Sequence, residues 1–389
     1  MISVSARNSL RLCVSCAVLS VFFWSNAQAQ NPGNRVAQAT ALATTPVTDG
    51  DVLGDPAWAG AEAITGFSQV RPNAGRAATQ KTDVYVGFTA TTMHVAVVAH
   101  DTDPDAIFAT DSRRDSSLDD TDAFLFVVDG LLDRQNGYVF GTNPAGMQFD
   151  GQVAQEGTGG FAGFGGAGFN KNWDAPWTVA TTVGDFGWSA EFEIPLTTLR
   201  FGTAEDQEWG FNFQRNIRRN YEVAYWAPLS QEHNIYRVSD AGTITGIRVP
   251  KQRNLQFTPY ILGRSQQGGD LPNRNNESEV GFDLKYSITP SLTLDATYNT
   301  DFAQVEADDQ QINLDRFSLF FPEKRPFFLE NAGQFTVGNS REVELFFSRR
   351  IGIGDSGQQS PIDGGLRLSG KVGSSTNVGL LHMSSEAVA

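Results

Sequence analysis

The run AFLFVVD, residues 123–129, is apolar at every position before its final Asp. A strand with this pattern has to be buried on both faces, because successive side chains point to opposite sides of a sheet. Short alternating runs bounded by Gly, Asn, Asp and Pro recur on either side of it, while the periodicity of amphipathic helices is almost absent after residue 29. The sequence therefore predicts an all-β protein in which this run is a central strand.

Eight such runs lie between residues 47 and 249, and their spacing predicts an antiparallel, jelly-roll-like β-sandwich over that range. The predicted strands are Thr82–Thr89, Thr92–His100, Asp122–Asp129, Gly137–Thr142, Trp177–Val183, Gly187–Ile194, Trp209–Ile217 and Glu222–Trp226.

Residues 1–29 have the composition of a secretory signal peptide. Arg7 and Arg11 precede an apolar run at residues 12–24, and a small-residue Ala-Gln-Ala sequence ends at residue 29. A membrane-spanning helix is the alternative, but the apolar run is shorter than the ~20 residues that such a helix needs. Both cysteines, Cys13 and Cys16, lie in this leader, so the rest of the chain can form neither a disulfide nor a thiolate metal site. We predict secretion across the inner membrane and a linker at residues 30–46.

The charge of the chain limits its partners. Lys and Arg number 29 against 44 Asp and Glu, which gives a formal net charge of −15. A charge of this sign opposes binding to nucleic acid, because both are negative. Neutral partners such as an oligosaccharide or polysaccharide remain open.

Residues 250–389 have a different pattern. In 279–286 and 292–299, and again in 365–372 and 377–383, apolar and polar residues alternate within segments joined by short turns. Such segments are typical of an outer-membrane β-barrel, whose apolar face contacts outer membrane lipid, although a second soluble sandwich also alternates. Closure needs at least ~8 strands, and this range offers about half a dozen. We therefore predict an incomplete transmembrane β-barrel, the N-terminal portion of a truncated domain.

The stretch FFPEKRPFFLENAGQF, residues 320–335, mixes aromatic and charged residues and is predicted to be a long insert between barrel strands. Its basic residues, with those of the later run ELFFSRRIG, are expected to face acidic partners inside the lumen. The basic set is Lys324, Arg325, Arg349 and Arg350, and the acidic set is Glu306, Asp308, Glu323 and Glu330.

Several motifs resemble one bacterial family, in which a domain similar to family 9 carbohydrate-binding modules precedes an outer-membrane barrel domain of unknown function. The first half of the resemblance is carried by DGDVLGDPAW (49–58), RRDSSLDDTDAFLFVVD (113–129) and GWSAEFEIPLTTLRF (187–201). The second half is carried by the insert at 320–335 and by LFFSRRIG (345–352). The resemblance implies saccharide binding by a clamp of two tryptophans with calcium nearby, and a role in carbohydrate catabolism.

Candidate ligand-binding residues follow from the chemistry of sugars, which bind to flat aromatic faces and planar polar groups. The pair in KNWDAPW is the predicted aromatic platform, with core packing as the alternative, and the charged loop before residue 123 supplies polar groups. The candidates are Trp173, Trp177, Arg113, Arg114 and Asp115. In the same loop three carboxylates are candidates for calcium, with a solvated turn as the alternative: Asp119, Asp120 and Asp122.

No residue is predicted to be catalytic. The chain lacks HExxH, Gly-x-Ser-x-Gly and phosphate-loop motifs, and its four histidines are scattered. Glu191 and Glu193 could pair as in a glycosidase, but a solvent-facing strand edge explains them equally well. The leading hypothesis is carbohydrate binding by a secreted, outer-membrane-associated protein with a periplasmic or surface-exposed sandwich. The alternatives are a transport or assembly barrel with the sandwich as plug or docking domain, and a glycoside hydrolase.

Overall fold

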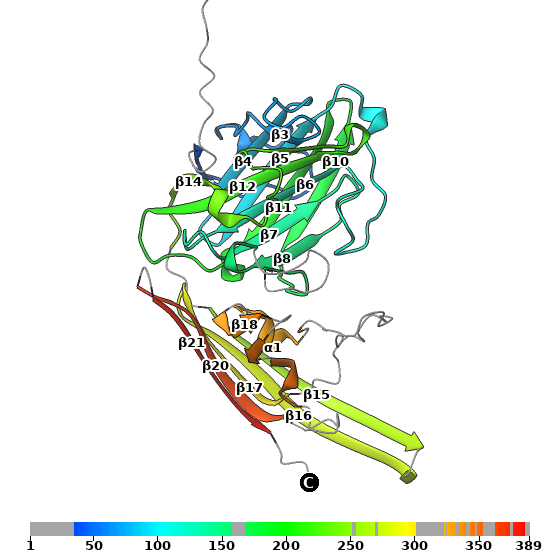
Figure 1. The fold of residues 1–389 in the computed structure, drawn as a ribbon, viewed down its shortest axis with the longest axis vertical. Helices are drawn as coiled ribbons and strands as arrows, with labels where there is room; N and C mark the ends of the chain where they lie inside the picture. Colours follow the sequence, from blue (N-terminus) through cyan, green and yellow to red (C-terminus); the bar gives the residue numbers. More distant parts are fainter. Residues whose placement is uncertain are drawn as a thin grey trace, which may run out of the picture. The chain divides into compact units, whose positions relative to one another are not determined.

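The computed structural model describes residues 35–157, 168–250, 254–268 and 271–300. Farther along, it describes residue 323 and residues 325–331, 334–335, 337–339, 343–346, 348–352, 362–373 and 376–385. The predicted leader at residues 1–29 lies outside these ranges. Among the described residues nearly all regular structure is β, as predicted (Figure 1).

The first sheet of the sandwich has nine strands, in the order β1-β14-β12-β6-β7-β8-β9, with β13 beside β12 and β3 beside β13. We call it sheet A. Its strands are β1 (Val36–Gln38), β3 (Ser68–Arg71), β6 (Ala123–Asp129), β7 (Gly137–Thr142), β8 (Phe149–Val153), β9 (Phe169–Asn170), β12 (Gln207–Ile217), β13 (Glu222–Tyr225) and β14 (Gly242–Ile247).

The second sheet, sheet B, has five strands in the order β10-β11-β5-β4-β2. They are β2 (Thr40–Ala41), β4 (Thr82–Phe88), β5 (Thr92–His100), β10 (Thr178–Gly184) and β11 (Gly187–Pro195). Short 3-10 helices connect strands at η2 (Pro56–Trp58), η3 (Pro104–Ala106), η4 (Gln155–Gly157), η5 (Leu196–Thr198), η6 (Arg218–Asn220) and η7 (Val238–Asp240).

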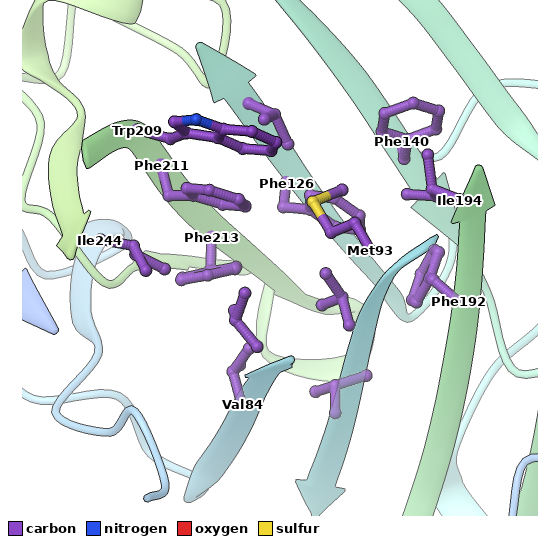
Figure 2. Packing of buried hydrophobic residues seen from close by; sticks show 14 of the residues in the cluster. Val84, Met93, Phe126, Phe140, Phe192, Ile194, Trp209, Phe211, Phe213 and Ile244 are labelled. Atoms are coloured by element: carbon purple, nitrogen blue, oxygen red, sulfur yellow. The ribbon is translucent and has the colours of Figure 1, made fainter. Parts of the chain in front are cut away.

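The main core lies between the two sheets and is rich in aromatic rings (Figure 2). Phe126 of β6 is fully buried, and its ring centroid lies 5.1 Å from that of Phe192 of β11 and 5.6 Å from that of Phe140 of β7. Met93 of β5 reaches the same space from sheet B. Large apolar side chains from both sheets therefore interdigitate, which is how a β-sandwich is stabilised.

A second apolar cluster forms from residues of opposite parity on the same strands. Leu125 and Val127 of β6 and Val139 of β7 pack with Ile235 and Val238, which follow β13 in the chain. All seven residues of β6 are buried. The predicted burial of this strand on both faces is confirmed.

The segment expected to be a linker contributes to both sheets. Val36–Gln38 pairs in parallel with β14, and two residues later Thr40–Ala41 pairs in parallel with β4. Ala39 between them is buried in the main core. The sandwich therefore begins before residue 47, because these residues complete an edge of each sheet.

Residues 255–385 include a separate antiparallel sheet of five described strands, in the order β15-β16-β17-β20-β21. The bounds are β15 (Leu255–Gly268), β16 (Leu271–Thr289), β17 (Leu292–Thr300), β20 (Ile362–Val372) and β21 (Thr376–Ser385). The hairpins predicted from alternation are present as β16–β17 and β20–β21. The order of the described strands is open, so the predicted barrel is not shown.

Between β17 and β20 the described residues include one short helix, α1 (Pro326–Leu329), the two-stranded pair β18 (Val337–Asn339) and β19 (Val343–Phe346), and the 3-10 helix η9 (Ser348–Arg350). The predicted insert is thus folded rather than extended as a wall strand. In the described part of the chain, no helix has the length and hydropathy needed to cross a membrane.

Candidate functional site

The connection between β5 and β6, residues 101–122, runs along one end of sheet A and is named here the β5–β6 loop. At this end β6 starts, β7 ends and β8 starts, since Phe124 pairs with Thr142 and Gly141 with Phe149. The loop is tied to these strand ends by two hydrogen bonds. Asn143 Nδ2 donates to the carbonyl of Asp111 at 2.7 Å, and the amide of Asp115 donates to the carbonyl of Gln148 at 3.0 Å.

Arg114 is the centre of a charged cluster in this loop. Its Nη2 lies 2.6 Å from Asp150 Oδ1 and 2.7 Å from Asp174 Oδ1, and its Nε lies 3.6 Å from Asp115 Oδ2. Its Nη1 donates to Gln148 Oε1 at 3.4 Å. Three segments of the chain therefore converge on one guanidinium, and we call Arg114, Asp115, Gln148, Asp150 and Asp174 the Arg114 cluster.

Burial within the cluster is graded. Asp150 is fully buried, and its second oxygen accepts from the amide of Ala175 at 3.0 Å. Arg114 and Asp174 are open to solvent, with 38% and 68% of their side chains exposed. The buried carboxylate of Asp150 orients the guanidinium, while the exposed parts of Arg114 and Asp174 stay available to a ligand.

The electrostatics of the cluster are dominated by its excess of carboxylates. The pKa of Asp150 is raised to about 6, chiefly by burial and with a contribution from Asp115 and Asp174, while Arg114 opposes the rise. Burial also raises the pKa of Asp115. Once its three carboxylates are ionised, the cluster with its one guanidinium carries a net negative charge. This charge disfavours anionic ligands.

The spacing of the three carboxylates is that of a possible cation site. Asp115, Asp150 and Asp174 each offer an oxygen within 4.8 Å of the others, and they are the single such acidic group among the described residues. Calcium takes six to eight oxygen ligands, whereas here Arg114 already occupies the space next to two of the carboxylates. Calcium therefore does not fit this arrangement unless Arg114 moves away.

The carboxylates predicted for calcium do not gather into a site. The buried Oδ2 of Asp122 accepts from the amide of Phe108 at 2.8 Å, and Asp120 pairs with Arg218 at 3.1 Å. Asp119 accepts from Ser117 Oγ at 3.3 Å. The prediction was wrong in its geometry, because neighbouring residues at the start of a strand point in different directions.

The predicted polar ligands are only partly brought together. Arg114 and Asp115 belong to the cluster, but Arg113 points away from it and forms a surface pair with Asp111 at 2.7 Å. Asp150 and Asp174 were missed by the sequence reasoning. Asp174 stands between the two tryptophans of KNWDAPW, which was the one local signal for it.

The expected exposure of Trp173 and Trp177 is wrong. They are 7% and 5% exposed and belong to the main core. The Trp173 ring lies 4.9 Å from that of Tyr138, and the Trp177 ring stacks on Phe192 at 5.8 Å. The segment turns inward because Asp150 holds the amide of Ala175 between them.

All six tryptophans in the described residues are buried: Trp58, Trp173, Trp177, Trp188, Trp209 and Trp226. A sugar needs an exposed aromatic face. Within the described ranges, the clamp of two tryptophans implied by the resemblance therefore has no counterpart.

Glu191, one of the pair considered for catalysis, is held by structural contacts. Its carboxylate accepts from Trp58 Nε1 at 2.9 Å and from the amides of Gly50 and Asp49 at 3.0 and 3.2 Å. Burial raises its pKa, and these donors oppose the rise. Glu193 accepts from Thr48 Oγ1 at 3.2 Å. Both anchor the N-terminal segment to sheet B, which differs from the solvent-facing edge considered for them.

In the C-terminal part, part of the predicted charge pairing is found. Arg325 pairs with Glu323 at 2.8 Å, as expected. Glu330 instead pairs with Arg200 and Lys285, and its carbonyl accepts from Arg367 Nη1 at 2.8 Å. Lys324, Glu306 and Asp308 lie outside the described residues, as does the side chain of Arg349.

Residues 251–367 match the model of a domain of unknown function, DUF5916. The chain carries a DUF5916 domain. The match spans β15 to β17 and ends within β20, so this domain contains most of the C-terminal sheet. No curated protein matches the chain.

Solved structures similar to this chain include two carbohydrate-binding modules. One is a family 9 carbohydrate-binding module from Caldicellulosiruptor kristjanssonii in complex with glucose, with 14% identity, 56% of this chain and 96% of that chain covered, and a TM-score of 0.39. The other is such a module from the same organism in complex with cellotriose, with 15% identity, 55% and 93% covered, and a TM-score of 0.38. The likeness does not assign a ligand to this chain.

Proposed function

We propose that the sandwich binds a neutral carbohydrate at the Arg114 cluster. The observation that carries the proposal is the arrangement of Arg114 itself, whose guanidinium is oriented by buried Asp150 while remaining partly open to solvent. A ligand meeting such a group does not have to order it first, and this preorganisation favours affinity.

The chemistry of the cluster suits sugar hydroxyls. A hydroxyl both donates and accepts, so it can donate to the carboxylates of Asp115 and Asp174 while accepting from Arg114. The negative charge of the cluster, within a chain of net charge −15, selects against anionic ligands. The motifs at residues 49–58, 113–129 and 187–201, which resemble family 9 carbohydrate-binding modules, agree with this proposal.

The test is calorimetric titration of the whole chain with a panel of neutral oligosaccharides, with and without calcium. Arg114→Ala is expected to weaken binding by about tenfold or more, since hydrogen bonds to charged groups contribute ~1.5–3 kcal/mol. Arg113→Ala is the matched control, because Arg113 lies next in sequence and 84% of its side chain is exposed outside the cluster.

Arg114→Ala also leaves Asp150 without its cation, so folding has to be checked by a variant at the surface of the cluster. Asp174→Asn changes a side chain that is 68% exposed and is expected to alter affinity without changing the thermal midpoint. The proposal fails if no saccharide of the panel gives heat, or if Arg114→Ala and Arg113→Ala bind alike.

A second proposal concerns the DUF5916 domain, whose sheet we infer to face lipid. Large apolar side chains are exposed on each of its five described strands, at Phe257, Val280, Tyr298, Leu366 and Leu380, while polar residues such as Asp295 and Ser369 are buried. Apolar-out, polar-in alternation is the pattern of strands in an outer membrane. It supports a transport or assembly role beside carbohydrate binding, after secretion directed by residues 1–29.

Lysine substitutions on β15 test whether the exposed apolar face of the C-terminal sheet contacts lipid or water. Ile261→Lys is expected to disfavour insertion into phosphatidylcholine vesicles by about 2–4 kcal/mol if the position lies near the midplane. Gln256→Lys on the same strand is the control, because alternation puts it on the other face. A chain that stays monodisperse in buffer and ignores vesicles would instead support a second soluble sheet.

A further inference from the structure

Two aromatic side chains of the sandwich are exposed in the described residues. Phe108 is 49% exposed and Tyr221 is 71% exposed, whereas the other described rings of residues 35–250 are buried or half-buried. Phe108 lies in the β5–β6 loop, and Tyr221 follows η6 between β12 and β13. Both are at the end of sheet A that carries the Arg114 cluster, because Asn216 at the end of β12 pairs with Ala123 at the start of β6.

Tyr221 has a backbone conformation that its residue type does not favour. It adopts the left-handed region, with φ 49° and ψ 30°. A bulky side chain is strained there, while Gly and Asn adopt the region readily. Because the ring is mostly exposed, packing does not offset this strain, so the stability of the fold does not account for a tyrosine at this position.

The ring of Tyr221 is nevertheless held in place. The guanidinium carbon of Arg218 lies 4.6 Å from the ring centroid, in the geometry of a cation–π contact. Arg218 is in turn paired with Asp120 of the β5–β6 loop at 3.1 Å. An exposed aromatic ring thus lies against a guanidinium whose own carboxylate partner, Asp120, reaches solvent.

Phe108 is fixed beside the same region through its backbone. Its amide donates to buried Asp122 Oδ2 at 2.8 Å, and its carbonyl accepts from Thr121 Oγ1 at 2.8 Å. The amide of Arg218 also lowers the pKa of Asp122, against the larger effect of burial. One buried carboxylate therefore lies between the two segments that carry the exposed rings.

The inference that follows rests on the proposed function and extends it. We infer that Tyr221, with Arg218 over one face of its ring and Asp120 paired with Arg218, is a second sugar-stacking subsite, and that the ligand is an oligosaccharide rather than a monosaccharide. An aromatic face packs against the C–H groups of a sugar ring, and the charged groups beside it meet the hydroxyls.

The separation of the two subsites determines the length of the ligand. Strands β12, β6, β7 and β8 are consecutive neighbours in sheet A, so three interstrand spacings separate the β12–β13 turn from the start of β8. At ~4.8 Å per spacing, this distance is on the order of 15 Å. A single sugar ring cannot contact both Tyr221 and Arg114, but a short chain of sugars can.

The test compares Tyr221→Asn with the parent chain, titrated with one monosaccharide and with oligosaccharides of increasing length. Asn is compatible with the left-handed conformation, so the thermal midpoint is expected to stay the same or rise. Affinity for the longer oligosaccharides is expected to fall about tenfold, while that for the monosaccharide is unchanged. Val183→Ala, which trims an exposed apolar residue of β10 in the other sheet, is the control.

Tyr221→Phe keeps the aromatic face and is expected to retain most of the affinity. A large loss in this variant would mean that the hydroxyl, and not the ring face, contributes the binding. If the parent chain binds oligosaccharides and Tyr221→Asn binds them equally well, the second subsite is refuted while the Arg114 site stands. If the parent chain binds none of the sugars, the proposed function itself fails. A lower thermal midpoint in Tyr221→Asn with unchanged length dependence assigns Tyr221 a structural role and also refutes the subsite.

Discussion

Strands β6 and β17 are both antiparallel and paired on each side, yet they bury opposite kinds of side chain. Every residue of β6 is buried, and all but Asp129 are apolar. In β17 the buried residues include Thr293, Asp295 and Thr297, while Tyr298 is exposed. The difference shows that burial in this chain is not a measure of hydrophobicity, because the sandwich folds around an apolar core and the DUF5916 sheet around polar contacts.

Polar burial in the DUF5916 domain is organised by charge pairs. Arg367 of β20 is 1% exposed, donates to Asp295 at 2.7 Å and also donates to the carbonyl of Glu330 at 2.8 Å. A buried pair of this kind is not by itself strongly stabilising, but removal of one partner leaves an uncompensated charge. The two regions should therefore respond differently to the same type of substitution.

The largest expected effect comes from the aromatic core. Phe126→Ala removes a fully buried ring that contacts the rings of Phe140 and Phe192, and is expected to lower the free energy of unfolding by about 3–5 kcal/mol. Phe257→Ala in β15 removes a ring that is 58% exposed and is expected to change it by less than ~1 kcal/mol in buffer. Urea unfolding followed by tryptophan fluorescence, with hydrogen exchange for β15, measures both. Similar losses of unfolding free energy in the two variants would contradict the difference between the apolar core and the C-terminal sheet.

A somewhat smaller effect is expected from the charge pair. Arg367→Met removes the Arg367 donors from Asp295 and from the Glu330 carbonyl, and is expected to cost about 3 kcal/mol, measured by hydrogen exchange of β17 and β20. Replacement of both Arg367 and Asp295 by Leu is expected to recover much of the loss. Arg248→Met is the surface control, since its partner Asp206 is itself 70% exposed. A double variant no better than the single one would contradict the role of uncompensated charge.

Another expected effect is a pH dependence of the sandwich. Burial raises the pKa of Asp129 to about 7, with Asp133 adding to the rise and the amides of Arg134 and Asp133 opposing it. An unfolded Asp titrates near ~3.9, so between these values the folded chain binds more protons. Stability contributed by this group is therefore present at low pH and declines as pH rises from about 4 to about 7.

Asp129→Asn cannot titrate and is expected to flatten that decline when thermal midpoints are measured across the same pH range. The comparison with the parent chain isolates Asp129, because other carboxylates titrate in both proteins. An identical pH profile in the two chains would show that Asp129 is not the group responsible.

Much of the fold followed from alternation, because long apolar strands have an unmistakable pattern. The runs at 82–89, 92–100 and 187–194 match β4, β5 and β11 to within a residue at each end. Short or polar strands were missed. The sequence of β8 is FDGQV, which does not have the pattern of a buried strand. Asp150 and Gln152 are buried in it because they are hydrogen-bonded to residues far away in the sequence, which the local pattern does not contain.

The site was less predictable, for a spatial reason. The loop at 113–122 was recognised as a display of charged groups, and Arg114 with Asp115 is part of the cluster. Its other acids, Asp150 and Asp174, come from segments that pairing of the strands brings beside Arg114. Trp173 and Trp177 flank Ala175, whose amide donates to Asp150, and composition does not reveal this contact with a distant segment.

The parallel pairing of β1 with β14 has a consequence for the order in which the sandwich can be completed. Ala37 accepts a hydrogen bond from Thr245, 208 residues farther along the chain. Synthesis proceeds from the N-terminus, so the first strand emerges long before its partner and has to wait, unpaired, for the last strand of the sandwich. Closure of this edge is thus a late event of assembly, and residues 36–38 keep their strand-pairing hydrogen-bond groups open until β14 has been made.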